Sequence, residues 1–131
     1  MSRFQQYRES MIDLGYEFIR SRVFQTAFEL DLFERLGDQS KTLLTLAQEM
    51  KAHWRSLELF LHALAALGLI EADGGAWRNT KHGKEIFIRG KPFYVGDLVG
   101  LHGRSFEDWG RLKEAVLSGK PLERMTRAAR G

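Results

Sequence analysis

Three side chains near the C-terminal end of the chain have the chemistry and spacing to line a site for a small aromatic molecule. His102, Phe106 and Trp109 are four and three residues apart, so on a helix all three lie on one face. An imidazole exchanges a proton near neutral pH, and the two aromatic rings offer flat apolar surface. The spacing predicts that the three side chains line one surface, and packing in a hydrophobic core accounts for the same pattern.

The other ionisable residues do not form a recognisable catalytic or metal-binding motif. Glu107 and Asp108 are adjacent, which on a helix separates their carboxylates by about 100° and favours a solvated face. The chain has no cysteine, and it contains neither a Ser/His/Asp arrangement nor a His-Glu-x-x-His motif. We therefore predict no catalytic residue and no metal site. The four histidines are scattered: His53, His62, His82 and His102.

Two groups of glycines are candidates for cradling a nucleotide. One is the turn at residues 73–75, and the other consists of positions 96, 100 and 103 within a predicted helix. A nucleotide cradle instead needs Gly-x-Gly between a buried strand and a helix, followed by an acidic residue for the ribose. No such unit occurs, so both groups are interpreted as structural and no cofactor-binding residue is predicted.

The composition is that of one globular domain. The 131 residues include 44% apolar and 28% charged ones, enough for one hydrophobic core but too few for two ordinary domains. The N-terminus is polar and no apolar run approaches a membrane span, so we expect a cytoplasmic protein without a membrane partner. The formal net charge of +3 is concentrated at the C-terminus, and we interpret residues 122–131 as a solvated basic tail.

The elements that would position these residues begin with a long helix over residues 8–36. Its apolar side chains fall on two opposite sides when the helix is wound at about 100° per residue. The surface helix of a monomer needs only one apolar face, so we predict that the second stripe is a dimer interface. Later helices of the same chain are the alternative cover. One stripe comprises Ile12, Tyr16, Ile19, Val23, Ala27 and Leu30, and the predicted interface comprises Met11, Leu14, Phe18, Phe24, Phe28 and Leu32.

Two further helices and a β-hairpin are predicted next. The second helix begins at Thr42 or Thr45 and runs to about residue 51, and the third spans about 54–67 before Gly68. Strand-like segments on either side of residues 73–75 predict a hairpin. Thr80 then caps a short helix. Two helices followed by a hairpin in this order predict a winged helix.

A long final helix is predicted over residues 93–118, where Gly119 and Pro121 end it. The predicted fold class is therefore mainly α. It is a winged helix-turn-helix with a small β-hairpin, flanked by a long N-terminal dimerisation helix and a long C-terminal helix. Residues 1–121 form this domain, and the basic tail follows it.

Four segments, in the same order and with similar gaps, resemble those of one known family. SRVFQTAFELDLF at 21–33 is similar to its first dimer helix, and ALAALGLIE at 63–71 to the end of its third winged-helix element. WRNT at 77–80, followed by Gly83, resembles its wing strand and capped helix. WGRL at 109–112 with SGKP at 118–121 resembles the segment before its catalytic domain. The family is the N-terminal dimerisation domain of plant-type and bacterial S-adenosylmethionine-dependent O-methyltransferases. His53-Trp54 departs from its pattern of a small polar cap followed by proline.

The resemblance implies an intertwined homodimer, followed by a Rossmann-like domain that binds S-adenosylmethionine and carries the general base. We therefore expect this chain to dimerise and to shape a substrate pocket, with His102, Phe106 and Trp109 as its wall. We do not expect it to be catalytic on its own, because the donor-binding domain is absent from it. S-adenosylmethionine is then the cofactor of the full-length family and not of this chain. The alternative partner is a complete methyltransferase, in a heterodimer.

A winged-helix DNA-binding transcription regulator is the alternative function. The predicted third helix offers His53, Arg55 and Ser56 at its exposed start, but Glu58 would repel phosphate. The hairpin adds a single arginine. Because affinity for duplex DNA comes largely from several phosphate contacts, we do not expect nucleic acid as a partner.

Overall fold

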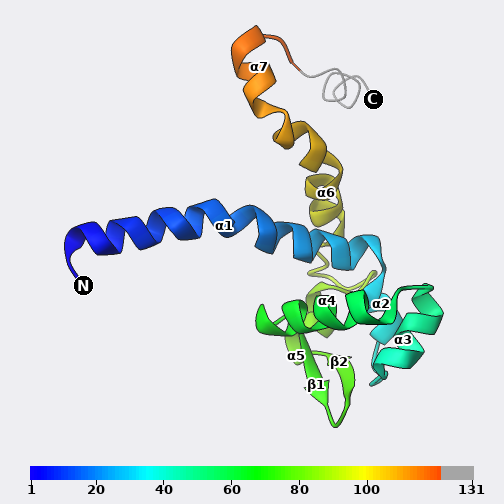
Figure 1. Cartoon of the computed structure of the whole chain (residues 1–131). Helices are drawn as coiled ribbons and strands as arrows, with labels where there is room; N and C mark the ends of the chain where they lie inside the picture. The colour runs from blue at the N-terminus through cyan, green and yellow to red at the C-terminus, as the bar shows by residue number, and fades with distance from the viewer. Residues whose placement is uncertain (122–131) are drawn as a thin grey trace.

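A winged-helix body carries two helical arms in the computed structural model, which describes residues 1–121 (Figure 1). The predicted basic tail, residues 122–131, lies outside the described residues. The arms are α1 (Arg3–Glu29) and the pair α6 (Gly96–Gly110) and α7 (Leu112–Ser118). The body consists of α2 (Leu32–Leu36), α3 (Leu43–Met50), α4 (Trp54–Ala66), β1 (Ile70–Asp73), β2 (Ala76–Asn79) and α5 (Lys81–Ile86).

Side-chain caps explain where the helices of the body begin. The hydroxyl of Thr42 accepts a hydrogen bond from the Thr45 amide at 3.2 Å, which selects Thr42 between the two predicted starts of α3. The hydroxyl of Thr80 accepts from the Gly83 amide at 2.9 Å, which confirms the predicted cap of α5. Nδ1 of His53 accepts from the Ser56 amide at 3.4 Å, so the unusual His-Trp pair still caps α4.

The hairpin forms as predicted and is tied into the body. Gly74 and Gly75 have φ angles of 52° and 85°, which suit a tight turn between antiparallel strands and are costly for other residues. The strands pair from Ile70 opposite Asn79 to the turn. The buried Asn79 amide donates to the Phe33 carbonyl at 2.9 Å and to the Gly37 carbonyl at 3.0 Å. This side chain therefore joins the second strand to the end of α2.

The core lies where α1, α2, α3 and α4 meet the hairpin. Its centre includes a cluster of phenylalanines, in which Phe33 and Phe87 have ring centroids 4.4 Å apart and Phe28 lies 5.0 Å from Phe33. Aromatic pairs at such distances add to the free energy of area burial. The core residues are Ala27, Leu32, Phe33, Leu36, Leu46, Ala47, Leu57, Leu61, Leu64, Ile70 and Phe87.

The first helix differs from the predicted span of residues 8–36. It begins at Arg3, because Ser2 and Gln5 form a reciprocal capping box. It ends at Glu29, because Asp31 adopts a left-handed backbone conformation with φ of 54°. The Arg89 guanidinium pairs with the Asp31 carboxylate, which raises the pKa of Arg89. A residue from the distant α5–α6 loop thus pairs with the residue at the break. The prediction of one continuous helix was therefore wrong.

The predicted final helix over 93–118 is also divided. The chain turns at Arg111, whose amide donates to the Asp108 carbonyl at 3.0 Å, three residues earlier. Gly110 comes just before the turn, and glycine weakens a helix at this point because it has the greatest backbone freedom to lose. The result is α6 followed by α7 in place of one helix.

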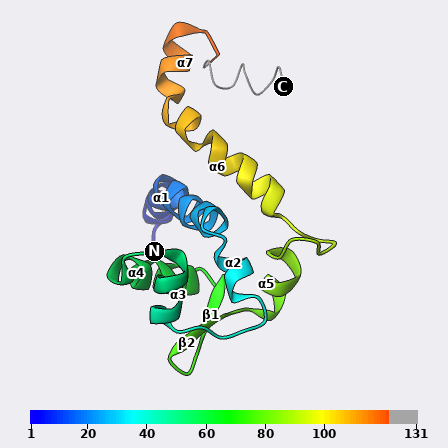
Figure 2. The same cartoon turned by 90° about the vertical axis from the view of Figure 1, so that its right-hand side faces the viewer.

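Both arms extend beyond the body. The N-terminal half of α1 projects away from α4 and the hairpin, whereas its C-terminal half packs over α4 (Figure 1). Helix α6 packs against α1 and leads to α7, far from the hairpin (Figure 2). None of the helices within residues 1–121 is long and apolar enough to cross a membrane.

Candidate functional site

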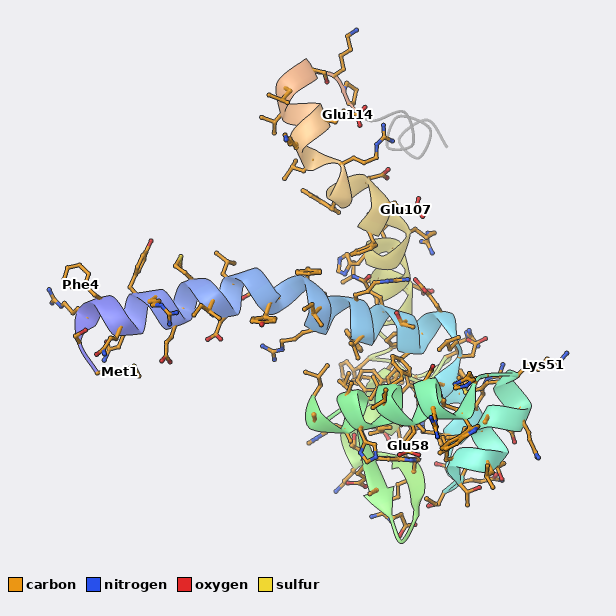
Figure 3. The ribbon with its side chains drawn as sticks, in the orientation of Figure 1. Met1, Phe4, Lys51, Glu58, Glu107 and Glu114 are labelled. Carbon is orange, nitrogen blue, oxygen red and sulfur yellow. The ribbon has the colours of Figure 1, made fainter. Side chains whose placement is uncertain are left out.

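The projecting half of α1 carries a stripe of large apolar side chains with no cover from its own chain. Every residue from 1 to 21 is exposed. Side chains at i, i+3, i+4 and i+7 share a face, and Figure 3 shows Phe4 at the far end of this arm. We call this face the arm stripe. It comprises Phe4, Tyr7, Met11, Leu14 and Phe18.

The opposite side of the same arm is also apolar and exposed. Ile12, Tyr16 and Ile19 continue the line of Val23 and Ala27, which pack on the core. Ile12, Tyr16 and Ile19 are exposed, and the N-terminal half of α1 projects beyond the body (Figure 1). Two uncovered apolar faces on one helix require a cover from outside the described residues.

The six side chains predicted as a dimer interface divide into two groups. Met11, Leu14 and Phe18 belong to the arm stripe, and 60% of the Phe18 surface is exposed. Phe24 and Phe28 are partly buried against the chain's own core. Leu32 is fully buried, because the left-handed turn at Asp31 directs α2 into the body. The prediction of Leu32 as an interface residue is therefore corrected: it is a core residue.

The structure brings the predicted pocket-wall residues together with the arm stripe. His102, Phe106 and Trp109 of α6 line a groove of about 360 Å³ against Phe18 of α1. Trp109 is 63% exposed, so the aromatic surface faces the groove opening and solvent instead of a core. The remaining residues that line this groove are Ser21, Gln25, Leu101 and Ser105.

Beside this groove, an arginine of α1 forms an ion pair within its own helix and a cation–π contact with a ring of α6. The Arg22 guanidinium donates to both carboxylate oxygens of Glu29, at 2.7 and 3.0 Å, and lies 5.0 Å from the centre of the Phe106 ring. The hydrogen bond to Glu29 raises the pKa of Arg22. We call Arg22, Glu29, Gly103 and Phe106 the seam.

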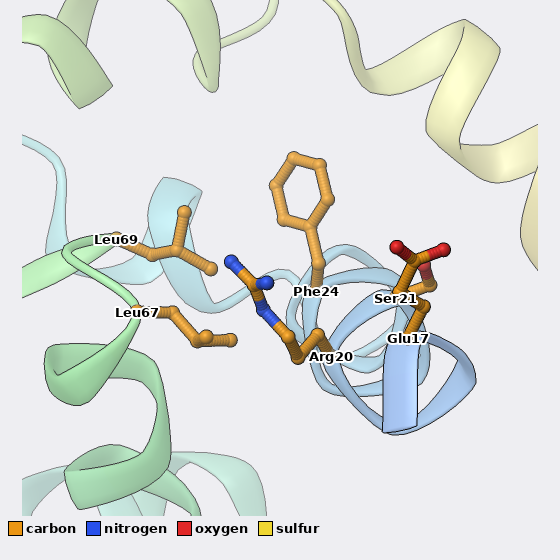
Figure 4. A pocket seen from close by; sticks show the side chains of 6 residues that line it. All are labelled: Glu17, Arg20, Ser21, Phe24, Leu67 and Leu69. Atoms are coloured by element: carbon orange, nitrogen blue, oxygen red, sulfur yellow. The ribbon is translucent and has the colours of Figure 1, made fainter. Parts of the chain in front are cut away.

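A second hollow lies on the other side of α1, where the helix leaves the body (Figure 4). It measures about 340 Å³ and is open. Glu17, Arg20, Ser21 and Phe24 of α1 line one side, and Leu67 and Leu69, next to the end of α4, line the other. The Arg20 side chain extends toward these two leucines in Figure 4. This hollow combines exposed charged groups with shallow apolar surface, and the combination does not indicate a particular ligand or reaction.

Sequence reasoning missed three features of this region. Phe4 and Tyr7 were omitted because the helix was started at residue 8, although Ser2 and Gln5 carry the capping-box pattern that marks its start. The pairing of Arg22 with Glu29, seven residues later on the same helix, was not predicted. The contact of Arg22 with Phe106 has no local signal, since the ring comes from a helix far along the chain.

The fold and the exposed apolar helix together define a class of protein. It is a winged helix whose first helix extends well beyond the body and offers apolar surface to another protein. A scan of protein families matches residues 12–86 to the O-methyltransferase dimerisation domain. Because the match includes more than half of the residues, the chain belongs to this family. Membership of a dimerisation family implies self-association.

Similar proteins share this fold at their matched regions. The tetracenomycin polyketide synthesis 8-O-methyl transferase TcmO of Streptomyces glaucescens is 37% identical over 112 residues, which are 84% of this chain and 33% of TcmO. An O-methyltransferase family protein from Burkholderia thailandensis superposes with a TM-score of 0.77 at 29% identity, over 86% of this chain and 34% of that one. Human N-acetylserotonin methyltransferase, solved in complex with SAM, superposes with a TM-score of 0.75 at 28% identity, over 88% of this chain and 35% of that one. The chain spans about a third of the length of the relatives it matches.

Membership of this family implies S-adenosylmethionine as the methyl donor, but the described residues form no site that fits it. The two strands that the structure describes form an antiparallel hairpin, and neither leads through a glycine-rich turn into a helix. Two of the α6 glycines have packing roles: a Cβ at Gly103 would lie 3.1 Å from Oε1 of Glu29, and one at Gly96 would collide with the Tyr94 ring. We therefore assign no residue in 1–121 to the methyl donor.

Metal chemistry has no candidate ligands in the same part of the chain. Across residues 1–121, no group of three His, Asp or Glu side chains is close enough to hold an ion. Glu107 and Asp108, the adjacent carboxylates, are exposed and buried respectively, so they do not work as a pair on one surface.

Proposed function

We propose that residues 1–121 act as the dimerisation domain of a small-molecule O-methyltransferase and form a homodimer through the arm stripe. The observation that carries this proposal is that every residue from 1 to 21 is exposed, although these residues include apolar side chains on two sides of one helix. Burying one large apolar side chain contributes about 1.5–3 kcal/mol. Several such side chains in each protomer therefore provide a large free energy of association.

We further propose that the groove shapes the acceptor pocket of the methyltransferase. Phe18, Phe106 and Trp109 present ring surface, and His102 adds a group that donates and accepts hydrogen bonds. Pockets for small molecules commonly combine aromatic walls with a few polar groups. The similarity to TcmO, which is named as an 8-O-methyl transferase of tetracenomycin polyketide synthesis, supports a small-molecule acceptor.

The partner is proposed to be a second copy of this chain, with a complete methyltransferase as the alternative. Both partners would cover the same stripe, so a test of self-association separates them. We expect light scattering at micromolar concentration to give the mass of a dimer for the chain alone. A monomer that becomes dimeric only when a complete methyltransferase is added would replace the homodimer with the heterodimer.

A pair of substitutions tests which surface is responsible. Met11→Ser with Phe18→Ser should raise the dissociation constant by about two orders of magnitude or more, because two apolar side chains are lost from each protomer. Leu59→Ser is the matched control, since Leu59 is 74% exposed on α4 and lies outside the stripe. Equal dissociation of both variants, or a dimer unaffected by the double substitution, would exclude the arm stripe.

The proposed role also predicts that this chain does not bind the methyl donor. Isothermal titration with S-adenosylmethionine should give no heat of binding, because residues 1–121 contain no strand-to-helix glycine turn. Micromolar binding would contradict the structural interpretation of Gly96, Gly100 and Gly103. A cytoplasmic location agrees with this role and remains part of the proposal.

The DNA-binding alternative gains no specific support from the structure. Arg78, the only arginine of the hairpin, pairs with Glu71 at 3.0 Å and with Asp73 at 3.4 Å, so both acids compete with phosphate for it. The exposed start of α4 presents Trp54, and its outer face presents Leu59. Salt-sensitive retention on random duplex DNA at ~50 mM salt, lost in Arg55→Ala with Arg78→Ala, would restore this alternative.

A further inference from the structure

The seam joins the two arms through one guanidinium. Arg22 donates to both carboxylate oxygens of Glu29, at 2.7 and 3.0 Å, while its Cζ lies over the Phe106 ring, 5.0 Å from the ring centre. A guanidinium is planar and always charged, so it can pair with a carboxylate and stack on a ring at the same time. One side chain of α1 therefore holds a ring that also lines the groove.

Gly103 permits the close approach that this geometry needs. A Cβ at this position would lie 3.1 Å from Oε1 of Glu29 and 3.6 Å from Cβ of Gln25. Glycine is otherwise unfavourable within a helix because it has the most backbone freedom to lose. The structural role of Gly103 is to let α6 lie close to Glu29 and Gln25.

Apolar packing holds only the beginning of α6. Val99 is buried, and the Val95 amide donates to the Ile86 carbonyl at 3.0 Å. Beyond Val99, no apolar side chain of α6 is buried in the described chain, and Phe106 and Trp109 are both exposed. Asp108 is the only buried residue in the second half of α6, so the seam is the main candidate for fixing the position of this half relative to α1.

We propose that Arg22 is a positioning residue, which fixes the approach of α6 to α1 and thereby sets the width of the groove. Its contacts with Glu29 and Phe106 orient the Phe106 ring toward Phe18 and Trp109 on the groove side. The functional meaning rests on the proposed role of the groove as an acceptor wall. The positioning itself is a geometric statement that can be tested separately.

Distances between spin labels on the two arms test the positioning directly. The chain has no cysteine, so Asp13→Cys on α1 and Lys113→Cys on α7 give one label on each arm, outside the groove. Labelled chain is diluted into a large excess of unlabelled chain, so that only distances within one protomer are measured. We expect a narrow distribution for the native seam. Arg22→Gln should broaden it and shift it to longer distances.

The controls separate the seam from general loss of charge or structure. Arg20→Gln removes an exposed arginine on the other side of α1 (Figure 4) and should leave the distribution unchanged. Arg22→Lys should act like Arg22→Gln, since an ammonium is a point charge without a planar face. High salt should broaden the native distribution, because Arg22 and Glu29 are partly exposed. If Arg22→Gln loses helical circular dichroism, Glu29→Gln serves as the test variant.

An unchanged distance distribution in a folded Arg22→Gln or Glu29→Gln variant would overturn the proposal. Binding of the fluorescent aromatic probe anilinonaphthalene sulfonate separates this failure from failure of the groove function. Weaker probe binding in Trp109→Ala together with unchanged distances in Arg22→Gln would refute the seam and retain the groove. Shifted distances in Arg22→Gln without any effect of Trp109→Ala on the probe would retain the seam and refute the groove as a binding surface.

Discussion

Helix α4 and the outer half of α1 both carry large apolar side chains at helical spacing, yet their surroundings differ completely. Leu57, Leu61 and Leu64 of α4 are buried by α3, the hairpin and α1. Residues 1–21, which include the outer half of α1, have no buried member. The body covers the main apolar face of α4, whereas neither apolar face of the outer half of α1 is covered. The body therefore buries its own apolar side chains, whereas the outer half of α1 needs a second protein to cover them.

The largest expected difference between the two regions concerns the free energy of unfolding. Leu61→Ala should lower it by about 2–5 kcal/mol at every protein concentration, because it leaves a cavity in the core of the body. Leu14→Ala on the arm should lower it only at concentrations where dimers form. Urea unfolding of both variants over a range of concentrations makes this comparison. A concentration-independent loss in Leu14→Ala would show that its own chain covers the arm.

Loss of the hydrogen bonds that join the hairpin to α2 should lower the free energy of unfolding by a smaller amount, and only in the body. Asn79→Ala removes a buried amide that donates to the carbonyls of Phe33 and Gly37. Leaving such acceptors unpaired costs about 1–3 kcal/mol. The dimer dissociation constant should not change, since no part of this tie lies on the arm. Denaturant unfolding and light scattering measure the two quantities, and a large change in dissociation would contradict the separation of the regions.

The smallest effects should come from the helix caps, which form a matched pair. Thr42→Ala removes the cap of α3 and should cost about 1 kcal/mol of stability. Ser2→Ala removes the cap of α1 and should reduce helix content at the arm tip in the monomer, without changing the unfolding of the body. Circular dichroism and denaturant unfolding distinguish these outcomes. A loss of body stability in Ser2→Ala would show that arm and body unfold together.

The parts of the fold that the sequence predicts are those with local causes. Thr80 caps a helix, Gly68 ends one with a positive φ, and Gly74 with Gly75 makes a tight turn, each through its own backbone chemistry. The winged helix follows from these elements taken in order.

The parts that could not be predicted depend on residues far apart in the chain. No glycine or proline marks the break at Asp31, which Arg89 binds from the α5–α6 loop. Leu32 was therefore placed on an interface, although the break turns it into the core. The groove was half predicted: the spacing of His102, Phe106 and Trp109 put them on one face, but their approach to Phe18 depends on how α6 packs on α1.

The central claim is that the outer half of α1 is held in place by a second protein and not by its own chain. Amide hydrogen exchange, measured at protein concentrations above and below dimer dissociation, tests this claim most directly. We expect protection of residues 3–21 to rise steeply with concentration, while protection of Leu61 and Leu64 in α4 stays nearly constant. Equal protection of residues 3–21 at every concentration would contradict the account.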